Sequence, residues 1–318
     1  MSECRPKCSQ HYSGIGGQAV LEGVMMRNGS KYCTAVRKPD GSIIAEPMEY
    51  HGILEDSFLK KTPFVRGIFV FIDSLILGMR SINYSADFWS EDEEDAGRTE
   101  KEKEKDAKTE GILSVLVTVL AFALAIGLFF VLPYFISSLL KNVIGSHFLL
   151  AVAEGVIRIG IFVLYISSIS MMKDIKRLYR YHGAEHKCIN CIESGLPLTV
   201  ENARKSTRFH KRCGSSFLIF VMMVSIVLFF FIRVESPVMK VVLRLLLIPV
   251  ISGISFELIR FAGSSDNPVI AVLSKPGIWL QHITTSEPDD SMLEVAIASV
   301  NAVFDWKSYL KEEFALEA

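Results

Sequence analysis

Four long apolar segments separate the polar regions of the chain. Each extends over about 20 residues or more, the length that an α-helix needs to cross the hydrocarbon core of a bilayer. The segments are 112–140, 148–172, 214–232 and 241–261. We therefore predict a polytopic α-helical membrane protein with four transmembrane helices, paired as a first hairpin over 111–172 and a second hairpin over 214–261.

A fifth apolar segment, 64–79, is shorter and is interrupted by Gly67, Asp73 and Gly78. An apolar stretch of this length suits a helix that lies in the membrane interface, or one that enters and leaves the bilayer on the same side. We therefore predict an interfacial or re-entrant apolar helix over 64–83.

The polar ends of the chain predict a small α+β cytoplasmic part. Residues 1–63 are rich in glycine and β-forming residues, and the turn sequence Lys38-Pro39-Asp40-Gly41 lies between an alternating segment, 32–37, and a returning strand at 42–46. In the C-terminal region, 262–318, the sequence Glu287-Pro-Asp-Asp predicts the start of an amphipathic helix over 292–304.

Charge is distributed unevenly along the chain. The 34 basic and 35 acidic residues nearly cancel, and this balance excludes a dedicated nucleic-acid-binding protein, which would carry a basic excess. Between residues 91 and 110, 15 of 20 positions are charged, with both signs mixed. Such a composition is typical of a solvated linker.

The basic residues also predict an orientation in the membrane. The region 173–213, between the second and third predicted spans, holds ten of them, whereas the connectors 141–147 and 233–240 hold one and two. Because basic loops stay on the cytoplasmic side, this region and both termini are expected in the cytoplasm. No apolar stretch of a secretory signal is present in the first 20 residues.

The basic region 173–213 also contains the residues with the most distinctive chemistry. His182 and His186 are four residues apart, so on a helix they share one face and can bind the same divalent metal. Glu185 lies between them in an H-x-x-E-H order, in which the carboxylate can act as a general base on metal-bound water. His210 and Cys213 directly precede the third predicted span, so all four groups can converge at one interface.

Two other interpretations of this region stay open. Cys188 and Cys191, together with His210 and Cys213, have a spacing compatible with a small structural zinc knuckle. Alternatively, the histidines lie on the surface, the thiols are inert, and the region binds no metal.

Five sequence blocks resemble the YqhQ family, a group of bacterial membrane proteins catalogued as a domain of unknown function and described as predicted metal-dependent enzymes. The blocks are 16–27, 181–187, 210–217, 285–290 and 294–296. The resemblance covers roughly residues 14–300. It departs at Cys188, where the family is expected to have threonine, and this departure weakens the zinc-knuckle interpretation. The resemblance implies a protein of the bacterial inner membrane and a suspected enzyme, with no assigned substrate or reaction.

Several charged residues away from the histidines are further candidates. Glu22 and Arg27 lie in a glycine-rich segment that could form a tight loop over a pocket or a simple ion pair. Glu154 and Arg158 are four residues apart within a predicted span and can pair on one face, facing the bundle interior. Glu257, near the cytoplasmic end of the fourth span, is a candidate third ligand or a carboxylate that orients a ligand.

These observations favour a metal-dependent membrane hydrolase. His182 and His186 would bind a divalent metal, with zinc preferred. His210, with or without Cys213, or Glu257 would complete the ligand set, and Glu185 would be the general base. The lipid bilayer is the one partner that the sequence implies; protein partners, substrate and oligomeric state are not specified. The alternative is a non-enzymatic transporter, channel or membrane scaffold in which a His/Cys metal clip is structural.

Overall fold

The computed structural model describes residues 11–53, 57–90, 113, 115–232, 234, 236–264 and 268–315. It divides into two compact units. The first, here called the sheet unit, combines three parts of the chain, Met1–Trp89, Ile169–Phe220 and Gly253–Ala318. The second, the helical unit, comprises Ser90–Ser168 and Val221–Ser252. The charged segment 91–110 lies outside the described residues.

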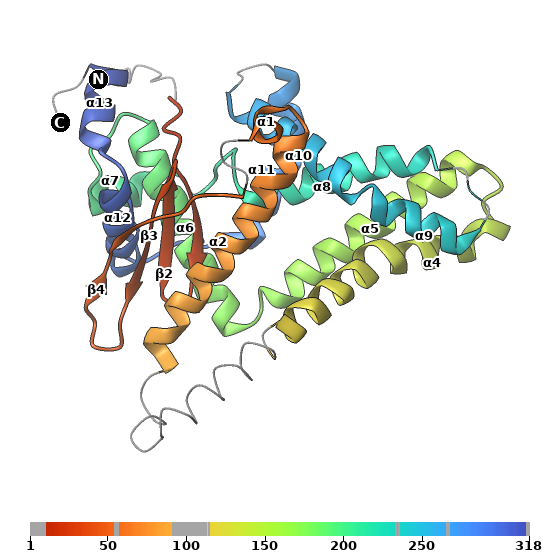
Figure 1. Ribbon diagram of the computed structural model, residues 1–318, viewed down its shortest axis with the longest axis horizontal. Coiled ribbons are helices and arrows are strands. Elements are labelled where there is room, and N and C mark those ends of the chain that lie inside the picture. The colour runs from red at the N-terminus through yellow and green to blue at the C-terminus, as the bar shows by residue number, and fades with distance from the viewer. Residues whose placement is uncertain are drawn as a thin grey trace, which may run out of the picture. The chain divides into compact units, whose positions relative to one another are not determined.

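A five-stranded antiparallel sheet organises the sheet unit (Figure 1). Its strands follow the order β1-β2-β3-β4. The fifth strand, β5, also pairs with β3, along the part of β3 that does not pair with β4. Their bounds are β1 Gly16–Val20, β2 Gly23–Asn28, β3 Lys31–Arg37, β4 Ile43–Ile44 and β5 Pro47–Glu49. The predicted hairpin is confirmed, because Val36 of β3 pairs with Ile44 of β4 across the expected turn.

The two central strands are covered on both faces. Side chains alternate along a strand, so Val24 and Met26 of β2 point into one hydrophobic cluster and Met25 points into another. The first cluster contains residues of α6 (Lys173–Glu193) and α12 (Asp290–Val303), and the second contains Leu77 of α2 (Val65–Ser90). Burial on both faces explains why the first four residues of β2, Gly23 to Met26, include no polar side chain.

Further helices complete the sheet unit. The N-terminal part contributes α1 (Phe58–Lys61), the basic region contributes α7 (Val200–Lys205) after α6, and the C-terminal region contributes α11 (Pro268–Thr284) and α13 (Trp306–Phe314) in addition to α12. The predicted helix start at the Glu287-Pro-Asp-Asp sequence is confirmed: Asp289 caps α12 by accepting the backbone N–H of Met292 at 3.0 Å. The helix α11 was not expected.

The helical unit is built from apolar helices. These are η1 (Gly127–Val131), α4 (Leu132–Leu139), η2 (Leu140–Asn142), α5 (His147–Ile169) and α9 (Pro237–Leu246); α8 (Gly214–Phe230) and α10 (Ile248–Ser264) belong partly to each unit. Aromatic pairs join the helices, for example Phe129 with Phe162 at a centroid distance of 5.7 Å and Phe130 with Phe229 at 6.2 Å. Many large apolar side chains face outward, as in Val115 and Leu164.

Two or three of these helices are long and apolar enough to cross a membrane. The helices Val115–Asn142 and His147–Ile169 meet this criterion, and Val238–Leu246 with Ile248–Ala262 forms a third span if the pair, bent by 41°, is counted as one. The bend coincides with Pro249, which has no backbone N–H to continue the helical hydrogen bonds. The predicted third span corresponds to α8, an apolar helix of 17 residues. The predicted interfacial segment forms α2, which has 26 residues.

Candidate metal centre

His182 and His186 lie on α6, on the face that the sheet unit buries. From Tyr181 to Glu193 the side chains of this helix are almost all buried, because the helix packs on the sheet and on α12. His182 and His186 are one helical turn apart, and their ring centroids are separated by 4.4 Å. The expected helical pairing of these two residues is therefore observed.

Cys213 completes a three-residue group with the two histidines. The ligand atoms of His182, His186 and Cys213 all lie within 4.8 Å of one another, and His182 Nε2 is 3.1 Å from Cys213 Sγ. In a tetrahedral zinc site the nitrogen and sulfur ligand atoms are roughly 3.5 Å apart, as bond lengths of about 2.1 and 2.3 Å require. This buried group could therefore hold a metal ion.

Backbone carbonyl groups fix the orientation of both imidazole rings. His182 Nδ1 donates to the carbonyl of Thr284 at 2.8 Å, and His186 Nδ1 donates to the carbonyl of Arg208 at 2.6 Å. A neutral imidazole that donates through Nδ1 carries its lone pair on Nε2. Metal-binding histidines are commonly oriented in this way, since the hydrogen bond selects the tautomer and aligns the ring.

The pKa values of His182 and Cys213 are strongly shifted by their surroundings. Burial raises the pKa of the Cys213 thiol, but the two adjacent histidines outweigh this effect and hold the pKa well below its usual range. Burial likewise lowers the pKa of His182, but the Cys213 thiolate and Glu185 raise it to about 9. Cys213 also precedes the first turn of α8, where the helix dipole favours a thiolate. The sulfur is therefore prepared to act as a metal ligand.

Glu185 lies beside this group and is also buried. Burial raises the pKa of its carboxyl group, and the nearby His186 and His182 lower it in part. The backbone N–H of Gly17 in β1 donates a hydrogen bond to this carboxylate. A side chain at position 17 would contact Glu185 Cγ at 2.9 Å, so the close approach of β1 to Glu185 requires glycine.

Polar side chains of α6 hold the segment that leads to Cys213. Lys187 Nζ donates to the carbonyls of Arg204 and Ser206, both at 2.9 Å. Asn190 Nδ2 donates to the carbonyls of Thr207 and Phe209 at 2.7 and 3.1 Å. Together with the His186–Arg208 bond, these interactions attach residues 204–209 to α6 and so determine where Cys213 lies.

Gln281 of α11 binds His210, the next residue of the same segment. Its Oε1 accepts the backbone N–H of His210 at 2.8 Å, and its Nε2 donates to the carbonyl of His210 at 2.7 Å and to Ser216 Oγ at 3.1 Å. Lys187, Asn190 and Gln281 are functional residues that were not predicted from the sequence. The spacing of the sequence could have indicated Asn190, because it lies four residues after His186 and therefore on the same face of α6.

His210 and Glu257, the other ligand candidates, interact elsewhere. His210 Nε2 is 3.4 Å from Glu193 Oε2, and the other carboxylate oxygen, Oε1, binds Arg212. The His210 and His186 rings are nevertheless only 5.6 Å apart. Glu257 accepts hydrogen bonds from Arg66 Nε and NH2 at 2.6 and 2.5 Å. Among the described residues, the group that can converge on one ion is formed by the two histidines of α6 and Cys213.

Glu22 contacts α6 one turn before the metal candidates. It adopts a positive φ of 49° in the turn between β1 and β2, and its carboxylate binds Arg177 and accepts from Tyr181 Oη at 3.1 Å. This ion pair, in which Glu22 is buried and Arg177 is half-exposed, attaches the β1–β2 turn to the helix that carries His182. Arg27 points away from this contact; its Nε donates to the carbonyl of Gly29 at 2.8 Å.

The remaining candidates are structural or belong to the helical unit. Cys188 and Cys191 lie within the hydrophobic cluster of the sheet unit, where burial raises the pKa of the Cys191 thiol to about 11. Cys191 Sγ donates to the carbonyls of Leu196 and Pro197 at 3.8 and 3.5 Å. Glu154 and Arg158 form the expected i,i+4 pair, at 2.7 Å, inside the helical unit.

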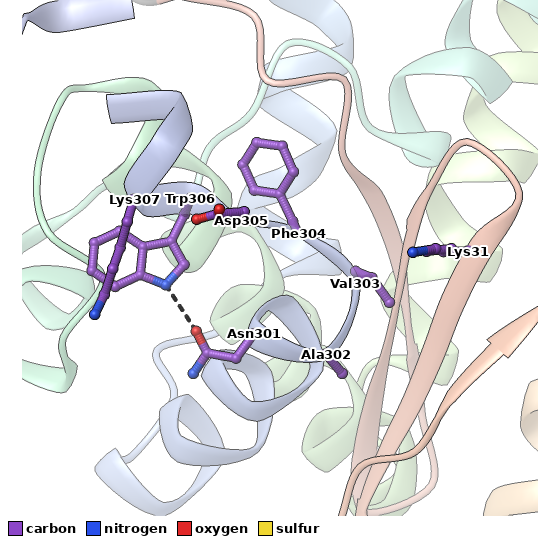
Figure 2. Close-up of a pocket in the computed structure, with 8 residues that line it drawn as sticks. All are labelled: Lys31, Asn301, Ala302, Val303, Phe304, Asp305, Trp306 and Lys307. Atoms are coloured by element: carbon purple, nitrogen blue, oxygen red, sulfur yellow. Dashed lines mark hydrogen bonds between the residues drawn. The ribbon is translucent and has the colours of Figure 1, made fainter. Parts of the chain in front are cut away.

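A cavity of about 400 Å³ in the sheet unit is chemically different from the metal candidate (Figure 2). It lies at the junction of α12 and α13, where Asn301 Oδ1 accepts from Trp306 Nε1 at 2.8 Å. Its lining residues include no histidine or cysteine; they are Lys31, Asn301, Ala302, Val303, Phe304, Asp305, Trp306 and Lys307. The His/His/Cys group is therefore the stronger candidate site.

The fold and the site define a mostly helical protein with a small antiparallel sheet, two or three helices able to cross a membrane, and a buried group that could hold a metal ion. The chain belongs to the family described as "Protein of unknown function (DUF1385)", which matches residues 62–306. It is 38% identical over 290 residues to the "Uncharacterized protein YqhQ" of Bacillus subtilis (strain 168), covering 90% of this chain and 91% of that protein. No solved structure matches the chain. The resemblance seen in the sequence is thus confirmed.

Proposed function

We propose that the protein is a metal-dependent membrane enzyme of the hydrolase type, with His182, His186 and Cys213 as the ligands of a divalent ion, preferably zinc. The orientation of the two rings carries the proposal. Each Nδ1 is engaged by a backbone carbonyl, which leaves Nε2 available beside a sulfur whose pKa is lowered. Three protein ligands with one position left open is the arrangement of catalytic zinc sites.

The chain's own residues have distinct roles in this proposal. A zinc ion bound by three protein ligands supplies a water molecule of lowered pKa at its remaining position. Glu185 is the proton acceptor, since a buried carboxyl with a raised pKa holds a proton more readily than an exposed one. The N–H of Gly17 keeps the carboxylate in place, and the carbonyls of Thr284 and Arg208 keep the ligand rings in place.

We further propose that the site lies at the cytoplasmic face of a bacterial inner membrane, with four spans and both termini in the cytoplasm. The excess of basic residues over 173–213 supports this orientation. Cys213 directly precedes the apolar helix α8, which suggests a substrate available at the membrane surface, either a lipid or a peptide. Labelling of an Ile144→Cys variant in intact cells tests the orientation; a reagent that reaches this position from the cytoplasmic side alone would contradict it.

The metal content of the purified protein tests the central claim. Full-length protein isolated without chelator should contain about one equivalent of zinc by elemental analysis, as three convergent ligands imply. The variants His182→Ala, His186→Ala and Cys213→Ala should lose it. His282→Ala, on α11, and Cys191→Ser are matched controls and should retain it. A metal-free wild type, or metal retained by folded ligand variants, would refute the proposal.

The alternative is a non-enzymatic membrane protein in which the same metal is a structural clip. The position of the three groups supports this alternative, because a metal bound by them would connect α6 to the start of α8. The hydrogen bond between His182 and Thr284 connects the end of α11 to the same site. Cobalt substitution distinguishes the two cases. In an enzyme, a hydroxamate should bind the open position and change the visible spectrum of the cobalt protein, whereas a closed structural site should give no change.

The variant Glu185→Gln tests whether Glu185 acts as a general base or as a metal ligand. It should retain zinc and fold, because the amide can still accept the N–H of Gly17, but it should lose proton transfer at the site. If this variant lost zinc to the same extent as Cys213→Ala, Glu185 would be a ligand instead of a base.

A further inference from the structure

The helical unit contains a large cavity that is separate from the metal candidate. Its volume is about 940 Å³, within the range of small-molecule sites. Its walls come from α4, η2, α5, α9 and the end of α8, together with the connectors around Gly145 and Val234. The lining combines apolar side chains such as Phe135 and Phe230 with the charged groups Lys141, Lys240, Arg244 and Glu154.

A buried cluster with excess positive charge lies at one end of this cavity. Glu154 accepts hydrogen bonds from Arg158 NH2 at 2.7 Å and from Arg244 NH2 at 2.8 Å. One carboxylate therefore faces two guanidinium groups, and all three side chains are nearly inaccessible to solvent. An isolated buried cation is costly, so an uncompensated one in an apolar helical unit indicates a functional role.

Arg244 is the residue whose hydrogen-bonding capacity is least used. Its side chain is 4% exposed and lines the cavity, yet its Nε and NH1 atoms have no hydrogen-bond partner. Tyr134 and Phe229 lie over the guanidinium carbon, both at 4.9 Å. These rings contact the faces of the group and leave its in-plane donors unpaired.

Further positive charge lies between this cluster and the helix ends. Arg244 is seven residues beyond Pro237, the start of α9, and Glu154 is seven residues beyond His147, the start of α5. At 1.5 Å per residue, both groups lie about 10 Å inside the unit. Lys240 is one turn closer to the start of α9, and Lys141 is in η2. The lysines would draw an anion from the helix ends toward Arg244.

We propose that this cavity binds a phosphate group, either of a lipid headgroup or of a free phosphate, through the unpaired donors of Arg244. The planar guanidinium matches phosphate oxygens in a bidentate arrangement, and an added anion would neutralise the second arginine of the cluster. The apolar walls leave room for an attached hydrophobic part of the ligand.

Binding to purified full-length protein in neutral detergent tests this site. One titration uses inorganic phosphate, and another uses mixed micelles of phosphatidylglycerol, with phosphatidylcholine for comparison. Arg244→Gln leaves the Glu154–Arg158 pair intact and should weaken binding by about ten- to one-hundred-fold, as expected for the loss of charge-assisted hydrogen bonds. Lys240→Gln should weaken it less, and Lys205→Gln, an exposed cation of the sheet unit, should leave it unchanged.

The outcomes separate the two sources of phosphate. Binding of phosphatidylglycerol alone, lost in Arg244→Gln, identifies a lipid headgroup; binding of both probes shows that the phosphate group is sufficient. Lys240→Gln provides a test that does not depend on the folding of the Arg244 variant. If the folded wild type binds neither probe, or if both variants bind like the wild type, the proposal is wrong and the cluster is a structural ion triad.

Discussion

Replacement of Gln281 by leucine should destabilise the sheet unit. The side chain of Gln281 is fully buried, and its amide bonds both backbone groups of His210. Leucine leaves that N–H and that carbonyl buried without a partner, at a cost of about 1–3 kcal/mol each, so the total is about 2–6 kcal/mol. At about 2–4 °C per kcal/mol, the Tm should fall by at least about 4 °C.

Thermal unfolding of the full-length protein in detergent measures this effect, and Asn301→Leu is the matched control. Asn301 loses one exposed hydrogen bond, to Trp306, so its Tm should change little. A second readout is zinc affinity, because Gln281 positions the segment that ends at Cys213; displacement of that ligand should weaken binding by about tenfold or more. Equal Tm values for the two variants would refute the reasoning.

Other predictions concern close packing and pH. Gly183→Ala would place a Cβ 2.0 Å from the carbonyl oxygen of Ser286, so it should lower the free energy of unfolding by about 1–3 kcal/mol, as is typical of overpacking, and lower the Tm with it. Gly160→Ala, in open space, should show no loss. Burial raises the pKa of Glu193, but His210 and Arg212 lower it below its usual value. The carboxylate therefore stabilises the fold above about pH 4.3, and this contribution is lost as the pH falls through the lower, folded-state pKa. Glu193→Gln should lower the Tm at pH 7, and a Tm difference from the wild type that does not shrink as the pH falls below about 4.3 would contradict this assignment.

The sequence predicted the local features of the site better than its long-range contacts. The spacing of His182 and His186 is a property of one helix, so the periodicity of α6 was sufficient to bring them together. The choice among His210, Cys213 and Glu257 as third ligand depends on how residues 204–212 fold back onto α6. That path is set by Lys187, Asn190 and Gln281, whose carbonyl partners leave no pattern in the sequence.

The fold was predictable to a similar extent. The hairpin at Pro39-Asp40 and the start of α12 carry local signals, the turn residues and the Asp289 cap, and both are observed. The strands β1 and β2 were harder to recognise, because β2 is buried on both faces and lacks alternation of apolar and polar residues. The apolar segments predicted membrane helices, but Pro249 divides one of them by a bend of 41°.

The division of the sheet unit into three separate parts of the chain has a consequence for biosynthesis. Its central strands are made first, α6 and Cys213 follow the first apolar hairpin, and Thr284, which orients His182, follows the last apolar segment. Among the described residues, a ribosome therefore completes the helices that are long and apolar enough to cross a membrane before it releases Thr284, which orients His182. Metal acquisition should accordingly be a late event, and an arrested chain ending at residue 263 should be inserted in the membrane while still unable to retain zinc.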